Sequence, residues 1–391
     1  MSNKLSGKNK FDLIILAGGR GSRISQYLKG IPKPMLKIKK FDFLEILLKN
    51  FSKYNLNKIF IAAGYKGKKI YQKYHNKKIN LIDVECIIEN KPLGTGGALN
   101  QFKNKTTKNF FVLNGDTFFD VNLNEIYKRY KHKKEIYLAL SNSKNYKTNN
   151  KLTNLIINKN KKITYDFKSN YFNGGIYFFN NKIFKKIPSK NFSLENDLLP
   201  FEIKNKNVIG DYFNNFFLDI GTPLSIKTGL KKLIKHLQKP AIFLDRDGTL
   251  IYDKGYTFKL RDLKFKKKVL DFLKRFRNKF YIFIVTNQSG IGRGLYTEQD
   301  FLNFQINLKE KIYKKKGILI DDLRYCPFIH SAKLKIYKKK SKFRKPDNLM
   351  IKSLLNSYFI NSKKSLMIGN SHTDQLCAKK SNLKYIDVDK I

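Results

Sequence analysis

Tryptophan is absent from the 391 residues, cysteine occurs only three times, and long apolar runs are missing. The cysteines at 86, 326 and 377 are odd in number and far apart, which predicts no disulfide framework. The apolar run that follows the basic N-terminus covers only residues 13–17, which is too short for a signal-peptide core or a membrane span. We therefore expect a cytoplasmic protein that does not use a membrane.

Acidic residues and arginine are also scarce. Asp and Glu number 30 against 80 Lys and Arg, which gives a formal net charge of +50, yet only 10 of the cations are Arg. Nucleic-acid readers use Arg for bidentate contacts to bases and phosphates, whereas here Lys is spread along the whole chain. We interpret the charge as a solvated lysine-rich surface without a specific nucleic-acid partner. A non-enzymatic polyanion-binding protein is kept as a remote alternative.

An α/β pattern is what the sequence does contain. Short apolar runs bounded by Gly, Asn or Asp are typical of buried, parallel strands, and the segments between them, such as 43–54 and 269–276, have helical spacing. The runs cover residues 13–17, 59–63, 110–113, 136–140, 176–179, 241–244, 281–285 and 366–368. A closing helix at 230–237 is followed by a Gln-Lys-Pro restart, so we predict two domains, 1–237 and 240–391.

Two aspartates, Asp245 and Asp247, follow a buried strand in AIFLDRDGTL (241–250). Open α/β sheets place ligands at the carboxyl ends of their strands. Two carboxylates at this spacing can divide the work of phosphoryl transfer, because one can attack phosphorus while the other handles the proton of the leaving group. A turn with two solvated acids is the structural alternative.

Three later stretches favour the chemical interpretation. TNQSGIGRG (286–294) is a natural phosphate cradle, FRKP (343–346) carries two cations, and MIGNSHTDQ (367–375) follows another strand with polar side chains. In this order the C-terminal half resembles the haloacid-dehalogenase (HAD) phosphatases. Within them it is most similar to the heptose 1,7-bisphosphate 7-phosphatases, with the histidinol-phosphate phosphatases as a sister family.

This resemblance implies a role for each matching residue. Asp245 would be the nucleophile that forms an aspartyl-phosphate, and Asp247 the general acid and base. The phosphate and substrate ligands would be Thr286, Asn287, Arg293, Arg344 and Lys345. The Mg²⁺ ligands would be Asp245, the backbone carbonyl of Asp247, Asn370 and Asp374.

Two departures from the family pattern matter. Asn370 stands where the family usually has Asp, so we expect weaker metal affinity, and an impaired phosphatase is an alternative. Many relatives hold a zinc ion with Cys and His residues, but here Phe328, Ser341 and Phe343 stand in place of three ligands. Since a closed zinc site needs four ligands, we expect no structural zinc.

The N-terminal half begins with a strand that runs into LAGGRGSRI (16–24), followed by IPKPM (31–35). The dinucleotide-binding and P-loop patterns both fail here. What remains is a glycine-rich loop with Arg20, Arg23 and Lys33, which suits a triphosphate, with a plain basic turn as the structural alternative.

Five further stretches follow in a defined order: PLGTGGAL (92–99), VLNGDTFFD (112–120), FNGGIYFF (172–179), FSLENDLLP (192–200) and FFLDIGTP (216–223). Over residues 11–230 this set resembles the sugar-1-phosphate nucleotidylyltransferases, and most of all the heptose 1-phosphate guanylyltransferases. The resemblance implies a GT-A-like, Rossmann-like mixed sheet here, beside a HAD-like parallel sheet in the C-terminal half.

The same resemblance implies the site residues. Arg23 and Lys33 would bind the triphosphate and stabilise the departing pyrophosphate, and Asp116 and Asp219 would hold Mg²⁺. The nucleotide would contact Gly18, Gly19, Gly21, Glu89, Gly94, Gly96 and Gly97, and the sugar phosphate would contact Lys168, Gly175 and Glu195. PLGTGGAL favours GTP, with UTP, dTTP and CTP as alternatives.

The two resemblances name successive steps, since removal of the 7-phosphate produces the heptose 1-phosphate that a nucleotidylyltransferase consumes. We therefore expect a bifunctional enzyme that makes GDP-heptose for a surface polysaccharide. Another sugar 1-phosphate, combined with a histidinol-phosphatase-like domain, is the alternative. Oligomeric state and sugar anomer have no signal in the sequence.

Overall fold

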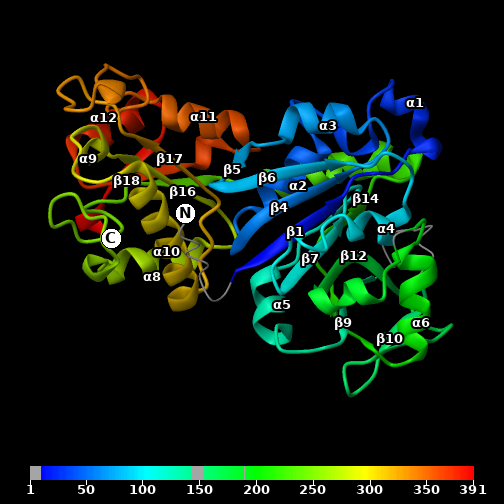
Figure 1. The fold of residues 1–391 in the computed structure, drawn as a ribbon. Helices are drawn as coiled ribbons and strands as arrows, with labels where there is room; N and C mark the ends of the chain where they lie inside the picture. The colour runs from blue at the N-terminus through cyan, green and yellow to red at the C-terminus, as the bar shows by residue number, and fades with distance from the viewer. Residues whose placement is uncertain (1–9, 143–152, 189) are drawn as a thin grey trace. The chain divides into compact units, whose positions relative to one another are not determined.

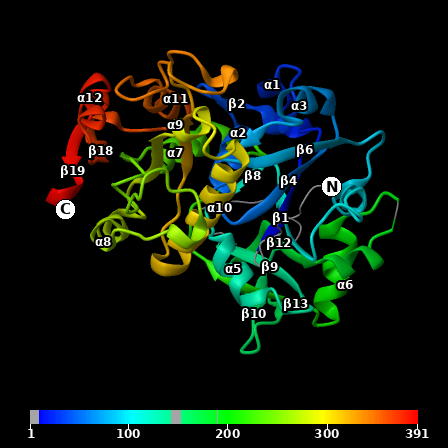
Figure 2. The ribbon, with the colours of Figure 1, turned by 60° about the vertical axis from the view of Figure 1, so that its left-hand side comes forward.

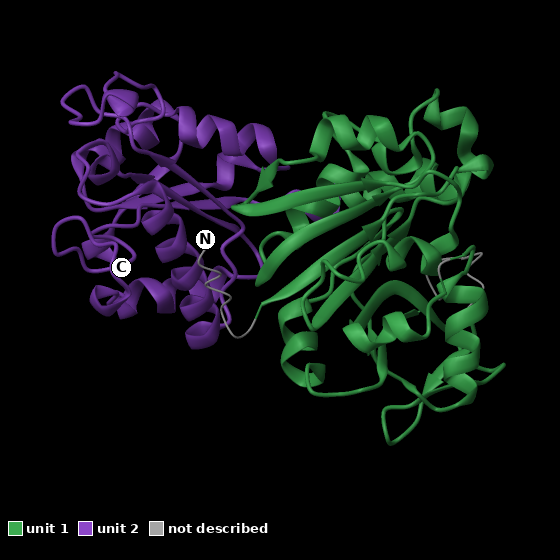
Figure 3. Cartoon of the chain, in the orientation of Figure 1, with its two compact units in different colours: residues 1–233 green, residues 234–391 purple. Residues whose placement is uncertain are grey.

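The computed structural model describes residues 10–142, 153–188 and 190–391. The chain divides into two compact units, unit 1 over residues 1–233 and unit 2 over residues 234–391 (Figure 3). No helix in the described ranges is both long and apolar enough to cross a membrane.

Unit 1 is built on a mixed eight-stranded sheet (Figure 1). In spatial order its strands are β13 (Val208–Phe213), β9 (Ile136–Asn142), β12 (Tyr171–Asn180), β7 (Asn109–Asn114), β1 (Phe11–Leu16), β4 (Leu56–Ala63), β6 (Ile82–Ile88) and β5 (Lys78–Ile79). β1 pairs in parallel with β4 and β7, whereas β12 is antiparallel to β7 and β9. The carboxyl ends of β1 and β7 therefore lie at the same edge of the sheet.

The helices and small sheets of unit 1 surround this large sheet. The helices are α1 (Ser25–Leu28), α2 (Phe43–Phe51), α3 (Gly67–Tyr74), α4 (Gly94–Asn100), α5 (Leu123–Tyr130), α6 (Leu199–Lys204) and α7 (Leu230–Leu237), which crosses the unit boundary. The small sheets pair β2 (Lys37–Ile38) with β3 (Phe41–Asp42), β8 (Thr117–Phe119) with β14 (Phe217–Asp219), and β10 (Leu155–Ile157) with β11 (Ile163–Tyr165). One core cluster joins α4 and α6 to strands β1, β7, β9 and β12, so both helices cover the same face (Figure 2).

Unit 2 is a parallel five-stranded sheet. In spatial order its strands are β17 (Asp322–Cys326), β16 (Tyr281–Asn287), β15 (Ala241–Leu244), β18 (Leu366–Gly369) and β19 (Lys384–Asp387). Its helices are α8 (Lys267–Phe276), α9 (Ser289–Gly292), α10 (Glu298–Lys316), α11 (Leu349–Ser357) and α12 (His372–Lys380). The central strand β15 is fully buried, as is expected of a parallel strand covered on both faces.

The predicted fold class is confirmed: a mixed sheet in one unit and a parallel sheet in the other. One detail of the prediction is wrong, because the run 176–179 lies in an antiparallel strand, β12. Nearly all of β12 is buried on both faces, and such a strand has the same continuous apolar pattern as a parallel one.

Candidate active sites

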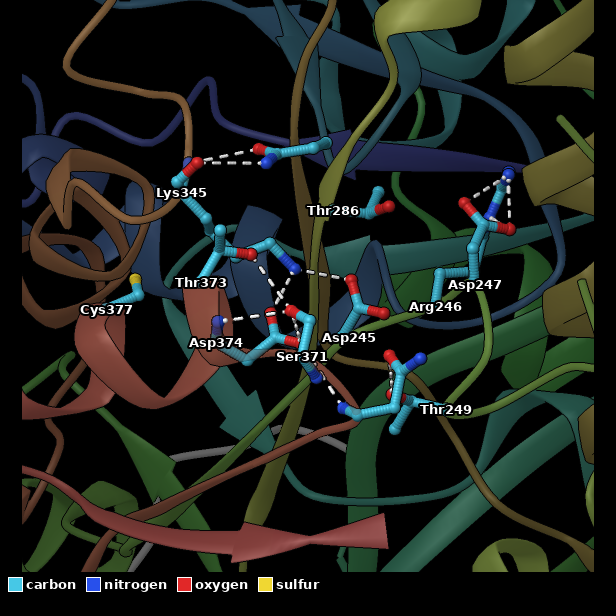
Figure 4. A network of polar contacts seen from close by, with 12 residues as sticks. Asp245, Arg246, Asp247, Thr249, Thr286, Lys345, Ser371, Thr373, Asp374 and Cys377 are labelled. Atoms are coloured by element: carbon cyan, nitrogen blue, oxygen red, sulfur yellow. Dashed lines mark hydrogen bonds and ion pairs between the residues drawn. The ribbon is translucent and has the colours of Figure 1, made fainter. Parts of the chain in front are cut away.

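The predicted phosphatase residues of unit 2 lie at one edge of its sheet. Asp245 directly follows β15, Thr286 lies near the end of β16, and Asn370 directly follows β18. Because these three strands are parallel neighbours, residues far apart in sequence converge there (Figure 4). The backbone N–H of Asp245 donates to the carbonyl of Ile368 at 3.0 Å, which fixes the loop that carries the aspartate.

Lys345 is the positive charge at the centre of this edge. Its Nζ contacts Oδ1 of Asp245 and lies 2.6 Å from Oδ1 of Asp374. All three residues are buried. Burial alone lowers the pKa of Lys345, but the two carboxylates outweigh it and raise this pKa to about 12. Burial raises the pKa of Asp245 to about 6 despite the opposing charge of Lys345.

Asp374 is engaged on both carboxylate oxygens. Oδ1 accepts from Lys345, and Oδ2 accepts from the Ser371 hydroxyl at 2.7 Å and from the Ser371 N–H at 3.2 Å, the second of which belongs to the capping box that begins α12. This geometry makes Asp374 the residue that holds Lys345. Asn370, predicted as a metal ligand with it, accepts a hydrogen bond on Oδ1 from the Thr249 hydroxyl at 3.0 Å.

Asn287 and Arg344 are the other predicted substrate ligands near Lys345 in this unit. The Asn287 amide pairs with the main chain of Lys345, donating to its carbonyl at 3.1 Å and accepting from its N–H at 3.0 Å. Arg344 is partly buried, and its Nη1 finds no hydrogen-bond partner in the described part of the chain. Burial and the nearby charge of Arg293 lower the pKa of Arg344. Two guanidinium groups close enough to influence each other are suited to an anion.

Asp247 is held by residues that the sequence analysis did not single out. Its Oδ1 accepts from Arg246 Nε at 2.8 Å, and its Oδ2 accepts from Arg246 Nη2 and Gln288 Nε2, both at 2.7 Å. In Figure 4 the carboxylate faces Arg246. The sequence analysis gives Arg246 no role, and in the folded chain its side chain is completely buried.

Aromatic packing occupies the region where relatives hold zinc. Cys326 is buried, while Phe328 and Phe343 pack against the core of unit 2 and His330 is exposed. The Lys339 ammonium lies 4.2 Å from the centre of the Phe328 ring. Among the residues described, no group of three or more His, Cys, Asp or Glu side chains is arranged to hold a metal. The absence of zinc stays a prediction.

In unit 1, Lys33 lies between the two aspartates that were predicted to bind metal. The β8–β14 register pairs Asp219 with Thr117 and so brings Asp219 next to Asp116. Lys33 Nζ lies 2.5 Å from Asp116 Oδ2 and 4.0 Å from Asp219 Oδ1. Desolvation raises the pKa of both acids. At Asp116 the attraction of the Lys33 ammonium outweighs desolvation, so the net pKa of Asp116 is lowered. At Asp219 desolvation dominates and the charge of Asp116 adds to it, so the pKa of Asp219 is raised to about 6.

The glycine-rich loop after β1 passes very close to other backbone. A Cβ atom on Gly64 would lie 2.6 Å from the Cα of Gly18, and one on Gly18 would lie 2.8 Å from Oε1 of Glu89. Glu89 therefore lies against the loop, and its contact with a nucleotide stays a prediction. Gly21 has φ of 67°, a left-handed conformation that favours glycine, and Gly19 and Arg23 are exposed.

The glycines at the start of α4 have a packing role in addition to their predicted one. The N–H groups of Gly96 and Gly97 donate to the Phe192 carbonyl at 2.9 and 3.0 Å. A Cβ on Gly97 would lie 2.4 Å from the Lys190 carbonyl, and one on Gly94 would lie 2.5 Å from that of Phe192. These positions admit the backbone of residues 190–194. Their contact with a nucleotide stays a prediction.

Two of the three predicted sugar-phosphate ligands are linked through buried side chains. Glu195 accepts from the hydroxyls of Thr95 at 2.5 Å and Tyr177 at 2.9 Å. Gly175 lies two residues before Tyr177 in β12 and has φ of 72°. Lys168 takes no part in these hydrogen bonds. It lies in an exposed turn, where its backbone N–H donates to Asp166.

Both edges present oxygen donors that fit Mg²⁺, which prefers carboxylate, carbonyl and water oxygens. In unit 2 the candidates are the carboxylate of Asp245, the amide oxygen of Asn370 and the backbone carbonyl of Asp247. Asp374, predicted as a further ligand, has both oxygens engaged by Lys345 and Ser371. In unit 1 the candidates are the carboxylates of Asp116 and Asp219, which are 34% and 35% exposed and so leave room for metal-bound water.

Two different family models match the two parts of the chain. The family model described as nucleotidyl transferase matches residues 13–236, and the model for haloacid dehalogenase-like hydrolases matches residues 313–388. The first match covers more than half of the chain.

Curated relatives match each unit separately. The chain is 31% identical over 229 residues to D-glycero-alpha-D-manno-heptose 1-phosphate guanylyltransferase of Aneurinibacillus thermoaerophilus, covering 57% of this chain and 98% of that protein. The Campylobacter jejuni enzyme of the same name is 32% identical, covering 54% and 94%. D-glycero-beta-D-manno-heptose-1,7-bisphosphate 7-phosphatase of Haemophilus ducreyi is 35% identical over 147 residues, covering 37% and 80%. The chain therefore belongs to the nucleotidyl transferase family, with a haloacid dehalogenase-like phosphatase domain following in the same polypeptide.

Proposed function

We propose that this chain is a bifunctional, Mg²⁺-dependent enzyme of NDP-heptose synthesis. Unit 2 hydrolyses the 7-phosphate of D-glycero-D-manno-heptose 1,7-bisphosphate, and unit 1 transfers GMP from GTP to the resulting heptose 1-phosphate with release of pyrophosphate. One observation carries the proposal: apart from the anomer at C1, the relatives of the two units are named for consecutive reactions, because removal of the 7-phosphate from heptose 1,7-bisphosphate leaves a heptose 1-phosphate.

In unit 2, Asp245 attacks the phosphorus atom and the sugar oxygen leaves. Asp247 lies two residues away and donates a proton to that oxygen, then takes one from the water that hydrolyses the aspartyl-phosphate. Lys345 offsets negative charge at the nucleophile and the transferred group. Bound Mg²⁺ supplies further charge neutralisation, and Asp245, Asn370 and the carbonyl of Asp247 would hold it.

In unit 1, a sugar phosphate oxygen attacks the α-phosphorus of the nucleotide directly, so no covalent enzyme intermediate is needed. Positioning and charge neutralisation carry the catalysis. Lys33 and Arg23 bind the triphosphate, while Glu195 and Gly175 orient the sugar phosphate. Asp116 and Asp219 would hold Mg²⁺, which would supply positive charge to the α-phosphate.

The anomer of the sugar is constrained by the fusion. The guanylyltransferase relatives are named for the alpha anomer, whereas the phosphatase relative is named for the beta anomer. Neither proposed step touches the bond at C1, so both units of this chain must use the same anomer. We therefore propose that unit 2 accepts the anomer that unit 1 consumes, and that one unit differs from its named relatives in this respect.

Mass spectrometry of a one-pot reaction tests the proposal. The protein is given the alpha or the beta heptose 1,7-bisphosphate, Mg²⁺ and equimolar GTP, ATP, UTP, CTP and dTTP. GDP-heptose from one anomer, with released phosphate and pyrophosphate, is the expected result. Heptose 1-phosphate without any NDP-sugar would contradict the transferase assignment, and unchanged bisphosphate of both anomers would contradict the phosphatase assignment.

A further inference from the structure

Arg246 is a fully buried charge for which the phosphatase chemistry above has no use. It is 0% exposed. The rings of Phe301 and Phe304 on α10 lie 5.4 and 5.1 Å from its Cζ atom. Its Nη1 has no hydrogen-bond partner among the described residues. Burying a guanidinium among aromatic rings is unfavourable unless ion pairs and hydrogen bonds offset its desolvation.

The contacts of Arg246 converge on Asp247. The guanidinium reaches both oxygens of that carboxylate, with Nε donating to Oδ1 at 2.8 Å and Nη2 to Oδ2 at 2.7 Å. A planar fork of this kind fixes orientation as well as distance. Nη2 also donates to the Thr257 carbonyl at 3.0 Å, which anchors the fork to the main chain.

Gln288 completes the support from a second element. Its Nε2 donates to Asp247 Oδ2 at 2.7 Å, while its Oε1 accepts from Tyr296 at 2.7 Å and from Arg246 at 3.2 Å. The amide is therefore held in one orientation by donors on its oxygen side. With three hydrogen bonds on two oxygens, rotation of the Asp247 carboxylate is blocked.

We propose that Arg246 and Gln288 are positioning residues that orient the Asp247 carboxylate for proton transfer with the leaving oxygen. This inference rests on the phosphatase function proposed for unit 2. Proton transfer needs a donor within hydrogen-bond reach of the leaving oxygen, and a carboxylate free to rotate would meet that condition only part of the time. The proposed nucleophile is Asp245, whereas the Arg246 fork holds Asp247. The attack on phosphorus therefore does not depend on the fork.

The test compares two leaving groups. An alkyl phosphate requires protonation of its leaving oxygen, whereas 4-nitrophenyl phosphate releases a stable anion that requires none. The value of kcat/KM covers only the steps up to leaving-group departure, so it excludes hydrolysis of the aspartyl-phosphate. For Arg246→Met we expect kcat/KM to fall about 10²-fold with the alkyl phosphate and no more than about threefold with 4-nitrophenyl phosphate. Arg246→Lys should restore part of the loss.

A double-mutant cycle separates positioning from a structural role. In an Asp247→Asn background, Arg246→Met should cause no further loss, because the group that it positions is already disabled. Equal losses with both substrates, or full additivity in the cycle, would overturn the inference. The half-saturating Mg²⁺ concentration and the unfolding transition of unit 2 are measured for each variant. If Arg246→Met changes only these two quantities and leaves kcat/KM unchanged, the positioning role is also wrong.

Failure of the proposed function has a different signature. If the unchanged chain cleaves neither phosphate, the phosphatase assignment falls and the inference falls with it. If the unchanged chain cleaves both and Arg246→Met does not discriminate between them, only the positioning role is wrong. Tyr296→Phe is the milder variant, since it removes one bond to Gln288 and leaves Arg246 in place.

Discussion

Each unit places a buried lysine between two aspartates, but the two centres differ in their exposure to water. Lys33 lies with Asp116 and Asp219, whose side chains are about one-third exposed, at 34% and 35%. Lys345 lies with Asp245 and Asp374, whose side chains are only 8% and 1% exposed. We refer to these sets as the Lys33 centre and the Lys345 centre.

The difference matches the chemistry proposed for each unit. At the Lys33 centre all the reacting groups belong to substrates, so the carboxylates must admit a hydrated cation and a bulky nucleotide. In the reaction proposed for the Lys345 centre, Asp245 itself becomes phosphorylated, and a water-poor setting strengthens the lysine contacts that hold this carboxylate. Lysine and aspartate therefore form a solvent-accessible substrate site in unit 1 and a buried reaction site in unit 2.

The largest predicted effect separates the two centres completely. Asp245→Asn should lower phosphate release by at least about 10⁴-fold, because it removes the nucleophile. Nucleotidyl transfer from supplied sugar 1-phosphate should be unchanged, as measured by pyrophosphate release. Asp347→Asn is the matched control, since the Asp347 side chain is 39% exposed and pairs with Lys380 at 2.7 Å. Loss of both activities in Asp245→Asn would contradict independent sites.

Removing the lysine of the closed centre should affect folding. Lys345→Met leaves two buried carboxylates without their cation, which we expect to lower the free energy of unfolding of unit 2 by about 3–5 kcal/mol. Urea unfolding followed by hydrogen exchange in each unit measures this, because the two units need not unfold together. A change below about 1 kcal/mol would mean that Asp245 and Asp374 are better solvated than the structure indicates.

Removing the lysine of the open centre should affect activity instead. In Lys33→Met, water can solvate Asp116 and Asp219, so unfolding should change by less than about 1 kcal/mol. Nucleotidyl transfer should fall by about 10²–10³-fold, because a preorganised positive charge is lost. The control is Lys37→Met, an exposed lysine four residues further along the chain. A strongly destabilised Lys33→Met protein would remove the contrast between the centres.

The open centre should also show competition between protons and metal. The pKa of Asp219 is raised to about 6, so below this pH its folded form is increasingly protonated and cannot ligate a cation. The half-saturating Mg²⁺ concentration for nucleotidyl transfer should therefore rise several-fold between about pH 7 and pH 5. Added Mg²⁺ should restore the rate. A requirement that is flat across this range would exclude Asp219 as a ligand.

The smallest effect concerns Asn370, which we propose as a neutral Mg²⁺ ligand of unit 2. Asn370→Asp adds a negative charge beside Asp245, so we expect the half-saturating Mg²⁺ concentration of the phosphatase to fall a few-fold, by about 1 kcal/mol of binding. Asn361→Asp, on the same unit before Ser362–Lys364, is the control for added charge. A sharp rise in the maximal rate would instead identify the natural chain as an impaired phosphatase.

The sequence predicted those elements whose signal is local. Each expected strand run lies in or mostly in a strand, and the helix expected at 230–237 is α7. β6 escaped notice because Asp83 and Glu85 interrupt its apolar pattern, as its partly exposed face allows. Contacts between distant residues could not be anticipated. The fit of Gly97 against Lys190 and the fork of Arg246 on Asp247 depend on backbone paths that only the folded chain defines.

The close backbone approach at Gly64 limits how this chain can change over generations. The chain is rich in lysine, and exposed positions tolerate most substitutions at little cost in stability. A side chain at Gly64 would meet the main chain of Gly18 at 2.6 Å, and one at Gly97 would meet the Lys190 carbonyl at 2.4 Å, where no flexible group can move aside. Compositional drift should therefore stop at these glycines, and a saturation library scored for nucleotidyl transfer should return glycine alone at both positions.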